Sequence, residues 1–286
     1  MTKDKKFHPK RTLKVAGKLF DLSTAVVMGI LNLTDDSFYD GGQQHTKRTA
    51  LLQVEKMLDE GASIVDIGAY SSRPGAQHIS EEEEWTRLEL ILPIVNKEFP
   101  EAIISIDTFR SEIVRKSIKN GADIINDISA GEMDAKIFDA IAELQVPYIM
   151  MHMLGTPQNM QENPQYDCIQ TEVFNYFKKK VKKLQEKGVK DIILDPGFGF
   201  GKTLKQNYQL LNNMETLQDL ELPILAGISR KSMIYKLLEN TPKEALNGTS
   251  VIHTLCLQQG ASILRAHDVK EAMECIKIVN FAQNNL

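Results

Sequence analysis

Asp191-Ile-Ile-Leu-Asp-Pro-Gly-Phe-Gly-Phe-Gly-Lys-Thr203 is the stretch whose plan recurs through the rest of the chain. Its apolar run, Ile192 to Leu194, is too short for a helix and is typical of a strand buried on both faces. The run ends in Asp195, an acid that is costly to bury unless a partner or a hydrogen-bonding ligand satisfies it. The glycines that follow let backbone and ligand approach closely. The stretch therefore predicts a buried strand that ends at a polar binding site.

Length and composition limit the possible classes. The chain has 286 residues, 42% of them hydrophobic, and a net charge of −4 with acids and bases mixed. This charge argues against a nucleic-acid surface. No apolar run approaches the roughly 20 residues that span a membrane, and the N-terminus lacks the apolar core of a signal peptide. The three cysteines have no metal-ligand spacing. We therefore expect reduced thiols in a cytoplasmic protein, with neither nucleic acid nor membrane as a partner.

Short apolar runs and helical patterns alternate along the chain. Residues 1–22 carry two short alternating segments around Gly17, which predict a small N-terminal hairpin. Eight strand-like runs follow: Ala25–Leu31, Ser63–Ile67, Ile103–Ile106, Asp123–Asn126, Pro147–Met151, Asp191–Leu194, Pro223–Ile228 and Ser262–Arg265. This alternation predicts a (β/α)8 TIM barrel over residues 23–286. A doubly wound open sheet is the alternative, and the strand count without a domain break favours the closed barrel.

Helix boundaries are marked by familiar residue types. Ser80–Glu83 and Thr241–Glu244 fit capping boxes, and Asp268–Glu271 is a weaker version of the same start. The runs Glu81–Glu84 and Lys178–Lys183 are expected to be solvated helix faces. Glycines stand where three helices should end, at positions Gly61, Gly121 and Gly188.

Polar residues stand at nearly every predicted strand end. A barrel of this kind performs its chemistry at the carboxyl ends of its strands. Of these residues we expect His152 to be packed rather than a general base. The set is Asn32, Tyr70-Ser-Ser-Arg73, Asp107, Asn126, His152, Asp195, Ser229-Arg-Lys-Ser232, Arg265 and His267. So many polar groups at one end indicate a bound polar ligand.

These strand ends fall within recognisable motifs. In chain order they are MGILNLTDDSFYDGG, GASIVDIGAYSSRPGA, SIDTFRSEIVRKSIKNGADIINDISAG, MMHMLGTPQNMQ, DPGFGFGKT, GISRKSMI and RAHDV. Together and in this order they resemble the dihydropteroate synthase family over roughly residues 23 to 280. That family joins a dihydropterin pyrophosphate to p-aminobenzoate in folate biosynthesis and releases pyrophosphate. The resemblance implies a transferase, a sulfonamide target and a homodimer.

Two groups of side chains carry the expected chemistry. Two carboxylates and an amide suit the donor-rich edge of a pterin, although Asp107 alone fits a helix cap equally well. Basic loops after the last two strands suit a phosphate group, and a surface ion pair is the alternative. The resemblance implies a pterin site of Asp107, Asn126, Asp195 and Lys231, catalytic roles for Asp107, Arg73 and Lys231, and a pyrophosphate site of Asn32, Ser72, Arg265, Ala266 and His267.

A metal and two lids follow from the resemblance. A single amide is poor evidence for a metal, but the family implies Mg²⁺ bound by the carbonyl of Asn32. The Gly-, Asp- and Ser-rich segments Thr34–Gly42 and Ser71–Ala76 are expected to be lids. The chain departs from the family at Asp35, where proline is usual, and at Tyr70, where glutamate is usual. The p-aminobenzoate pocket implied by the resemblance consists of Phe38, Arg73, Pro74, Phe200 and Ser232.

The expected mechanism is an ionising displacement. Mg²⁺, Arg265 and His267 stabilise the departing pyrophosphate, Asp107 stabilises the pterin-methyl cation, and the aromatic amine attacks without a covalent enzyme intermediate. A corrinoid methyltransferase that shares the pterin acids is one alternative, and a non-catalytic pterin-binding paralogue is another. The basic loops argue against the first, and the presence of Arg73, Lys231 and Arg265 argues against the second.

Overall fold

The computed structural model describes residues 11–33, 42–72 and 78–285. Three residues of the expected site, Phe38, Arg73 and Pro74, lie outside these ranges, as does most of both expected lid segments.

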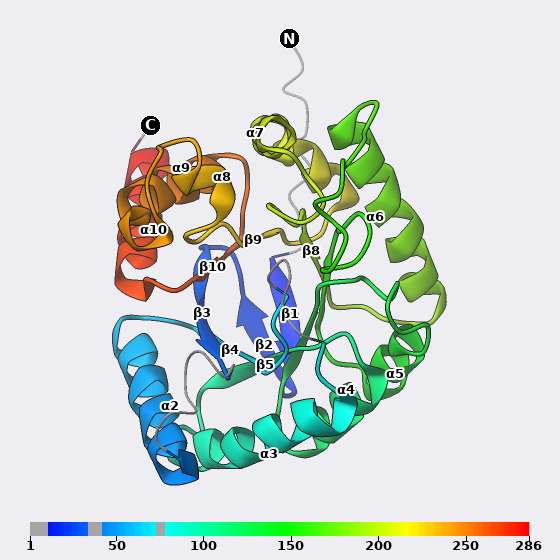
Figure 1. Ribbon diagram of the computed structural model, residues 1–286, viewed down its shortest axis with the longest axis vertical. Coiled ribbons are helices and arrows are strands. Elements are labelled where there is room, and N and C mark those ends of the chain that lie inside the picture. Colours follow the sequence, from blue (N-terminus) through cyan, green and yellow to red (C-terminus); the bar gives the residue numbers. More distant parts are fainter. Residues whose placement is uncertain (1–10, 34–41, 73–77, 286) are drawn as a thin grey trace.

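Parallel strands form a barrel, as the sequence predicts (Figure 1). The strand order is β8-β7-β6-β5-β4-β3-β10-β9, and a parallel bridge between Leu194 and Ile224 joins the two ends of the sheet. The described residues contain eight such strands: β3 (Val26–Asn32), β4 (Ile64–Gly68), β5 (Ile103–Asp107), β6 (Ile124–Asp127), β7 (Tyr148–Met151), β8 (Ile192–Asp195), β9 (Leu225–Ala226) and β10 (Ile263–Ala266). The TIM-barrel prediction is confirmed.

Helices surround the strands on the outside of the barrel (Figure 1). Their buried faces pack on the outward-facing strand residues and form the main hydrophobic core. They are α2 (Gly42–Asp59), α3 (Glu81–Glu98), α4 (Ser111–Lys119), α5 (Ile137–Leu144), α6 (Ile169–Glu186), α7 (Leu204–Asn212), α8 (Ser232–Tyr235), α9 (Leu246–Gln258) and α10 (Val269–Asn284), with 3-10 helices η2 (Met214–Leu220) and η3 (Pro242–Glu244). Gly61, Gly121 and Gly188 have positive φ where helices end, as predicted.

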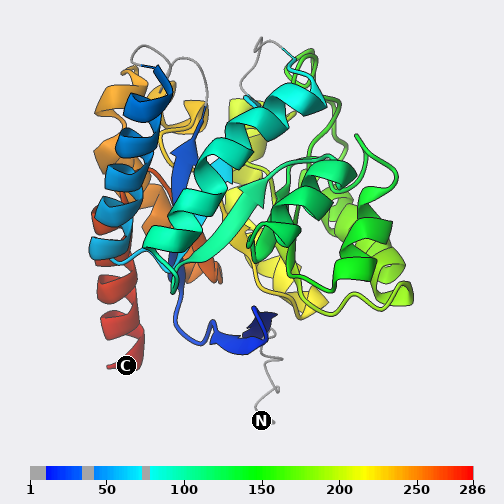
Figure 2. The same ribbon diagram turned by 90° about the horizontal axis from the view of Figure 1, so that it is seen from below.

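The N-terminal hairpin closes one end of the barrel (Figure 2). Strand β1 (Thr12–Val15) pairs antiparallel with β2 (Lys18–Asp21) through a turn in which Ala16 and Gly17 both have positive φ. Its buried side chains Leu13 and Val15 contact the first inward layer of the barrel, which includes Met28, Ile64, Ile124, Ile193 and Ile263. Burying one such side chain contributes about 1.5–3 kcal/mol. The hairpin therefore keeps water out of the amino-terminal end and leaves the carboxyl-terminal end for a ligand.

The alternation of side chains along the strands places polar groups above this apolar layer. Side chains on a strand return to the same face every second residue. Two residues beyond Ile64, Ile124, Ile193 and Ile263 stand, respectively, Asp66, Asn126, Asp195 and Arg265. The inner face of the barrel therefore changes from apolar to polar or charged over two residues of each strand.

Some predicted boundaries and faces differ from the structure. The strand predicted at Pro223–Ile228 is shorter, and the box at Thr241–Glu244 begins the short helix η3 rather than an α-helix. The box at Ser80–Glu83 is half formed, because the Glu83 carboxylate pairs with Arg87 instead of returning to the backbone. The prediction of solvated faces was wrong at Glu84 and Lys180, since both side chains are buried.

Candidate active site

A guanidinium held by two carboxylates lies at the centre of the carboxyl-terminal end. Arg265 of β10 donates from Nε to Asp66 Oδ2 at 2.7 Å and from Nη2 to Asp107 Oδ2 at 2.9 Å. Asp66 comes from β4 and Asp107 from the last position of β5. Asn126 of β6 donates its amide to the same Asp66 oxygen at 2.9 Å. Four strands therefore contribute to one connected polar cluster.

Asp195 and Lys231 form the other side of the site. Lys231 donates to the backbone carbonyl of Phe198 at 2.7 Å, and its ammonium lies 4.5 Å from the centre of the Phe200 ring. A Cβ atom on Gly227 would lie 3.6 Å from Asp195 Oδ2 and 3.8 Å from Lys231 Nζ. The carboxylate and the ammonium therefore border the same small space, which the missing side chain of Gly227 leaves open.

Burial shifts the pKa values of Asp107, Asp195 and Lys231. It raises the pKa of Asp107 to about 7, even though the neighbouring Arg265 opposes the change. Burial also raises the pKa of Asp195 against the attraction of Lys231. The pKa of Lys231 is lowered by burial to about 8, with Asp195 opposing. Each charge is therefore held in place at a desolvation cost that a polar ligand can offset.

The remaining predicted residues take different positions. His267 is exposed beyond β10, and its Nδ1 and backbone N–H contact Ser229 Oγ at 3.1 and 3.2 Å. Ala266 is buried in β10, and Ser232 opens α8 directly after Lys231. Ser72 follows β4 and is half-buried. Among the described residues, Ser72 makes no hydrogen bond to the central cluster.

Asn32 ends β3 and is half-buried. Among the described residues its side chain makes no hydrogen bond, so its carbonyl oxygen is free to coordinate. Within the same ranges, no group of three or more His, Cys, Asp or Glu side chains could hold a metal ion. The protein residues therefore fit only a metal that takes most of its ligands from substrate oxygens and water, as Mg²⁺ commonly does.

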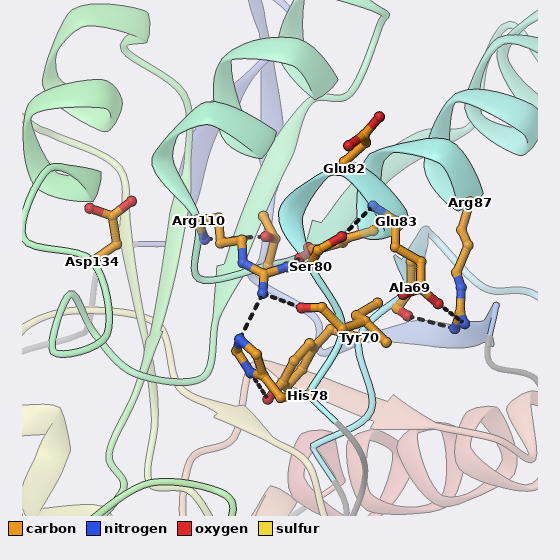
Figure 3. A network of polar contacts seen from close by, with 12 residues as sticks. Ala69, Tyr70, His78, Ser80, Glu82, Glu83, Arg87, Arg110 and Asp134 are labelled. Atoms are coloured by element: carbon orange, nitrogen blue, oxygen red, sulfur yellow. Dashed lines mark hydrogen bonds and ion pairs between the residues drawn. The ribbon is translucent and has the colours of Figure 1, made fainter.

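A second polar network braces the exits of β4 and β5 (Figure 3). Arg110 forms a buried ion pair with Glu84 and donates to the carbonyl of Ile79 at 2.6 Å. Its Nη2 also lies 3.3 Å from His78 Nε2, and His78 Nδ1 lies 3.1 Å from the Tyr70 hydroxyl. Breaking a buried ion pair by removing one partner costs about 3–5 kcal/mol. The network therefore fixes both described ends of the loop between β4 and α3.

A buried lysine holds the loop after β8. Lys202 Nζ donates to His152 Nδ1 at 3.0 Å and to the carbonyls of Gly197 and Phe200, both at 2.9 Å. Burial lowers the pKa of Lys202 and of His152, which suits a neutral imidazole that accepts at Nδ1. As predicted, His152 is packed. Through this contact it supports the loop that carries Phe200.

The sequence did not indicate Asp66, the acid that joins the side chains of Arg265 and Asn126. Asp66 is fully buried in the middle of the run Ile-Val-Asp-Ile-Gly, and so it does not stand at a strand end. The spacing of residues along the strand could have identified Asp66 as inward-facing. Asp66 is two residues from the inward-facing Ile64, the same spacing that separates Asp195 from Ile193.

The fold and this cluster define a barrel that binds a small polar ligand at the carboxyl ends of its strands. Residues 28–267 match the model of a family described as pterin binding enzyme. The chain therefore belongs to the pterin-binding enzyme family.

Within that family the chain is similar to dihydropteroate synthases. It is 44% identical over 266 residues to the enzyme of Escherichia coli strain K12, covering 92% of this chain and 93% of that one. A Yersinia pestis dihydropteroate synthase with a sulfonamide drug has a TM-score of 0.90 and 39% identity, with 96% and 99% coverage. The Xanthomonas albilineans enzyme with 4-aminobenzoic acid has a TM-score of 0.89 and 35% identity, covering 96% of this chain and 98% of that one. The same enzyme with 7,8-dihydropteroate has a TM-score of 0.85 and 33% identity, covering 95% of this chain and 98% of that one.

The burial of Asp107 predicts that its carboxyl group titrates near pH 7, whereas an ordinary aspartate titrates near pH 4. Acidification through pH 7 should therefore neutralise one of the two acids that hold Arg265. Carbon-13 NMR of the aspartate carboxyl groups should show a resonance that titrates near pH 7 and is absent from the Asp107→Asn variant. If that assigned resonance titrated below pH 5, the description of the site would be wrong.

Proposed function

We propose that the chain condenses 6-hydroxymethyl-7,8-dihydropterin pyrophosphate with p-aminobenzoate to give 7,8-dihydropteroate and pyrophosphate in folate biosynthesis. The observation that carries the proposal is the convergence of Asp107, Asn126, Asp195, Lys231 and Arg265 at one end of the barrel. The similarity to dihydropteroate synthases extends over nearly the whole chain. It includes structures of relatives that hold 4-aminobenzoic acid or the dihydropteroate product.

The pterin binds between Asn126, Asp107, Asp195 and Lys231. The carboxylates and the amide oxygen accept hydrogen bonds from the N–H groups of its aminopyrimidine edge. The pterin carbonyl accepts a hydrogen bond from the Lys231 ammonium. Charge-assisted hydrogen bonds of this kind contribute about 1.5–3 kcal/mol each. They also discriminate against ligands that lack the donors, because the buried acids would then stay unpaired.

The pyrophosphate lies at the exits of β9 and β10. Arg265 supplies a guanidinium that suits a multidentate anion, and His267, Ala266 and Ser72 complete the proposed contacts. Asn32 would hold Mg²⁺ together with pyrophosphate oxygens and water, and the bound ion supplies Lewis-acid stabilisation to the leaving group. These residues hold the pyrophosphate where positive charge stabilises it as a leaving group.

Departure of pyrophosphate leaves positive charge on the pterin methylene carbon. Asp107, in its carboxylate form, lies beside Arg265 at 2.9 Å and stabilises that charge as Arg265 follows the leaving group. The amine of p-aminobenzoate then attacks the methylene carbon and loses its proton. Phe200, next to Lys231, and Ser232 line the proposed p-aminobenzoate pocket, and Phe38, Arg73 and Pro74 remain predictions outside the described residues.

The function is tested by pyrophosphate release. The purified protein with the dihydropterin pyrophosphate, p-aminobenzoate and Mg²⁺ should release one pyrophosphate per dihydropteroate formed. The Asp107→Ala variant should lose turnover by a factor of about 100 or more, since it removes the charge that faces the cation. Pterin affinity should be measured separately by calorimetry.

Two results would contradict this proposal. Absence of release by the wild-type protein would reject the reaction, and unchanged turnover and pterin affinity in Asp107→Ala would remove that residue from the mechanism.

We also propose that the protein acts in the cytoplasm as a homodimer. Among the described residues, no helix is both long and apolar enough to span a bilayer. Adjacent helices α9 and α10 expose four apolar side chains: Val251 (53%), Leu255 (39%), Ile278 (68%) and Phe281 (73%). Large exposed apolar side chains on two neighbouring helices suit a protein contact, and a second copy of the chain is the proposed partner.

The dimer contact predicts a mass of about 64 kDa, twice the chain mass of 32.2 kDa, in sedimentation equilibrium. A double variant, Ile278→Glu with Phe281→Glu, should sediment as a monomer because charge would be buried in the contact. Leu19→Glu is the matched control, since Leu19 is 80% exposed on the hairpin at the other end of the barrel. A wild-type monomer at micromolar concentration would refute the dimer.

A further inference from the structure

We propose that Asp66 is a positioning residue, which holds the Arg265 guanidinium and the Asn126 amide in the orientations that meet the substrate. The identity of that substrate rests on the proposed function, whereas the role of Asp66 rests on its contacts. Asp66 Oδ2 accepts from Arg265 Nε at 2.7 Å and from Asn126 Nδ2 at 2.9 Å.

The burial of Asp66 shows that this arrangement is costly. Its side chain is fully buried, and its other oxygen, Oδ1, has no hydrogen-bond partner among the described residues. An unsatisfied buried polar atom is destabilising. A smaller apolar residue in the middle of β4 would avoid this cost, so the acid is best explained by the two side chains that it holds.

Asp66 fixes the plane of the Arg265 guanidinium. One contact, at Nε, comes from Asp66, and a second, at Nη2, comes from Asp107. A planar guanidinium held at two of its nitrogens can no longer rotate about its long axis. Nη1 makes no hydrogen bond to a described residue, so it remains available to an anionic ligand. Without Asp66, only the Asp107 contact would orient the group.

Asp66 also determines which end of the Asn126 amide faces the ligand. A carboxylate only accepts hydrogen bonds, so the NH₂ group must point to Asp66 and the carbonyl oxygen must point elsewhere. Asn126 is therefore presented to the ligand as an acceptor. A ligand with an N–H donor at that position is favoured, and one with a second acceptor is disfavoured.

The neighbouring acid Asp127 provides a contrast. It is equally buried, and its partners are the Tyr148 hydroxyl at 2.6 Å and groups of Ser129 and Gly131 at 2.7–2.8 Å. Those partners are Tyr148 at the start of β7 and two residues of the turn that follows β6, and none of them belongs to the proposed site. Asp127→Asn therefore has a comparable structural cost without the positioning role, and it serves as the matched control.

The test measures binding of inorganic pyrophosphate, in Mg²⁺ buffer, and of pterin by calorimetry. Asp66→Asn should weaken pyrophosphate binding by about tenfold or more, because it removes one charge-assisted contact that orients Arg265. Pterin binding should weaken as well, whereas the KM of p-aminobenzoate should change less than about threefold. Asp127→Asn should lower the melting temperature and leave both affinities within about twofold.

A double variant separates positioning from general damage. If Asp66 acts on pyrophosphate through Arg265, then Asp66→Asn should change pyrophosphate affinity less than about twofold in the Arg265→Ala background. A loss of the same size in both backgrounds, or equal losses in Asp66→Asn and Asp127→Asn, would overturn the proposal. So would the absence of pyrophosphate binding by the wild-type protein.

A second variant covers the case in which Asp66→Asn does not fold. Arg265→Lys keeps the charge and leaves β4 intact, but it cannot engage both acids in the same way. Its pyrophosphate affinity should fall about tenfold, and an unchanged affinity would contradict the claim. If the wild-type protein binds both ligands but forms no product, the proposed reaction fails while the test of Asp66 still holds.

Discussion

The site depends on one half-buried guanidinium held between carboxylates from two other strands. Arg265 and the two acids Asp66 and Asp107 depend on one another, because removing either partner of such an ion pair leaves the other charge uncompensated. This mutual dependence ties β4, β5 and β10 at their carboxyl ends. It also brings the acid proposed to face the pterin, Asp107, into contact with the base proposed to face the pyrophosphate, Arg265.

The barrel makes this arrangement possible because its apolar packing and its polar site lie at different levels along its axis. The lower inward layer is apolar and is covered by the hairpin residues Leu13 and Val15. The next inward positions carry the charged and polar groups, so a single step of two residues along each strand moves from core to site. The polar site can therefore lie at the open end of the barrel without disturbing the packed end.

The fold and much of the site could be predicted from the sequence, because polar residues at strand ends mark convergence in a barrel. Asp107, Asn126 and Asp195 were found in this way. Asp66 was not, because it stands within an apolar run and its partner Arg265 is 199 positions away. The burial of Glu84 was also missed, since an acidic run at a helix start normally faces water. Only tertiary contact with Arg110 reveals its role.

The most direct measurement is a crystal structure of the protein with pterin and pyrophosphate bound. We predict that Asn126, Asp195 and Lys231 all lie within about 3.2 Å of the same pterin molecule. Arg265 should contact the pyrophosphate while its Nε still donates to Asp66. A pterin bound away from these side chains, or side chains divided between two separate cavities, would contradict the central claim that the strand ends converge on one ligand.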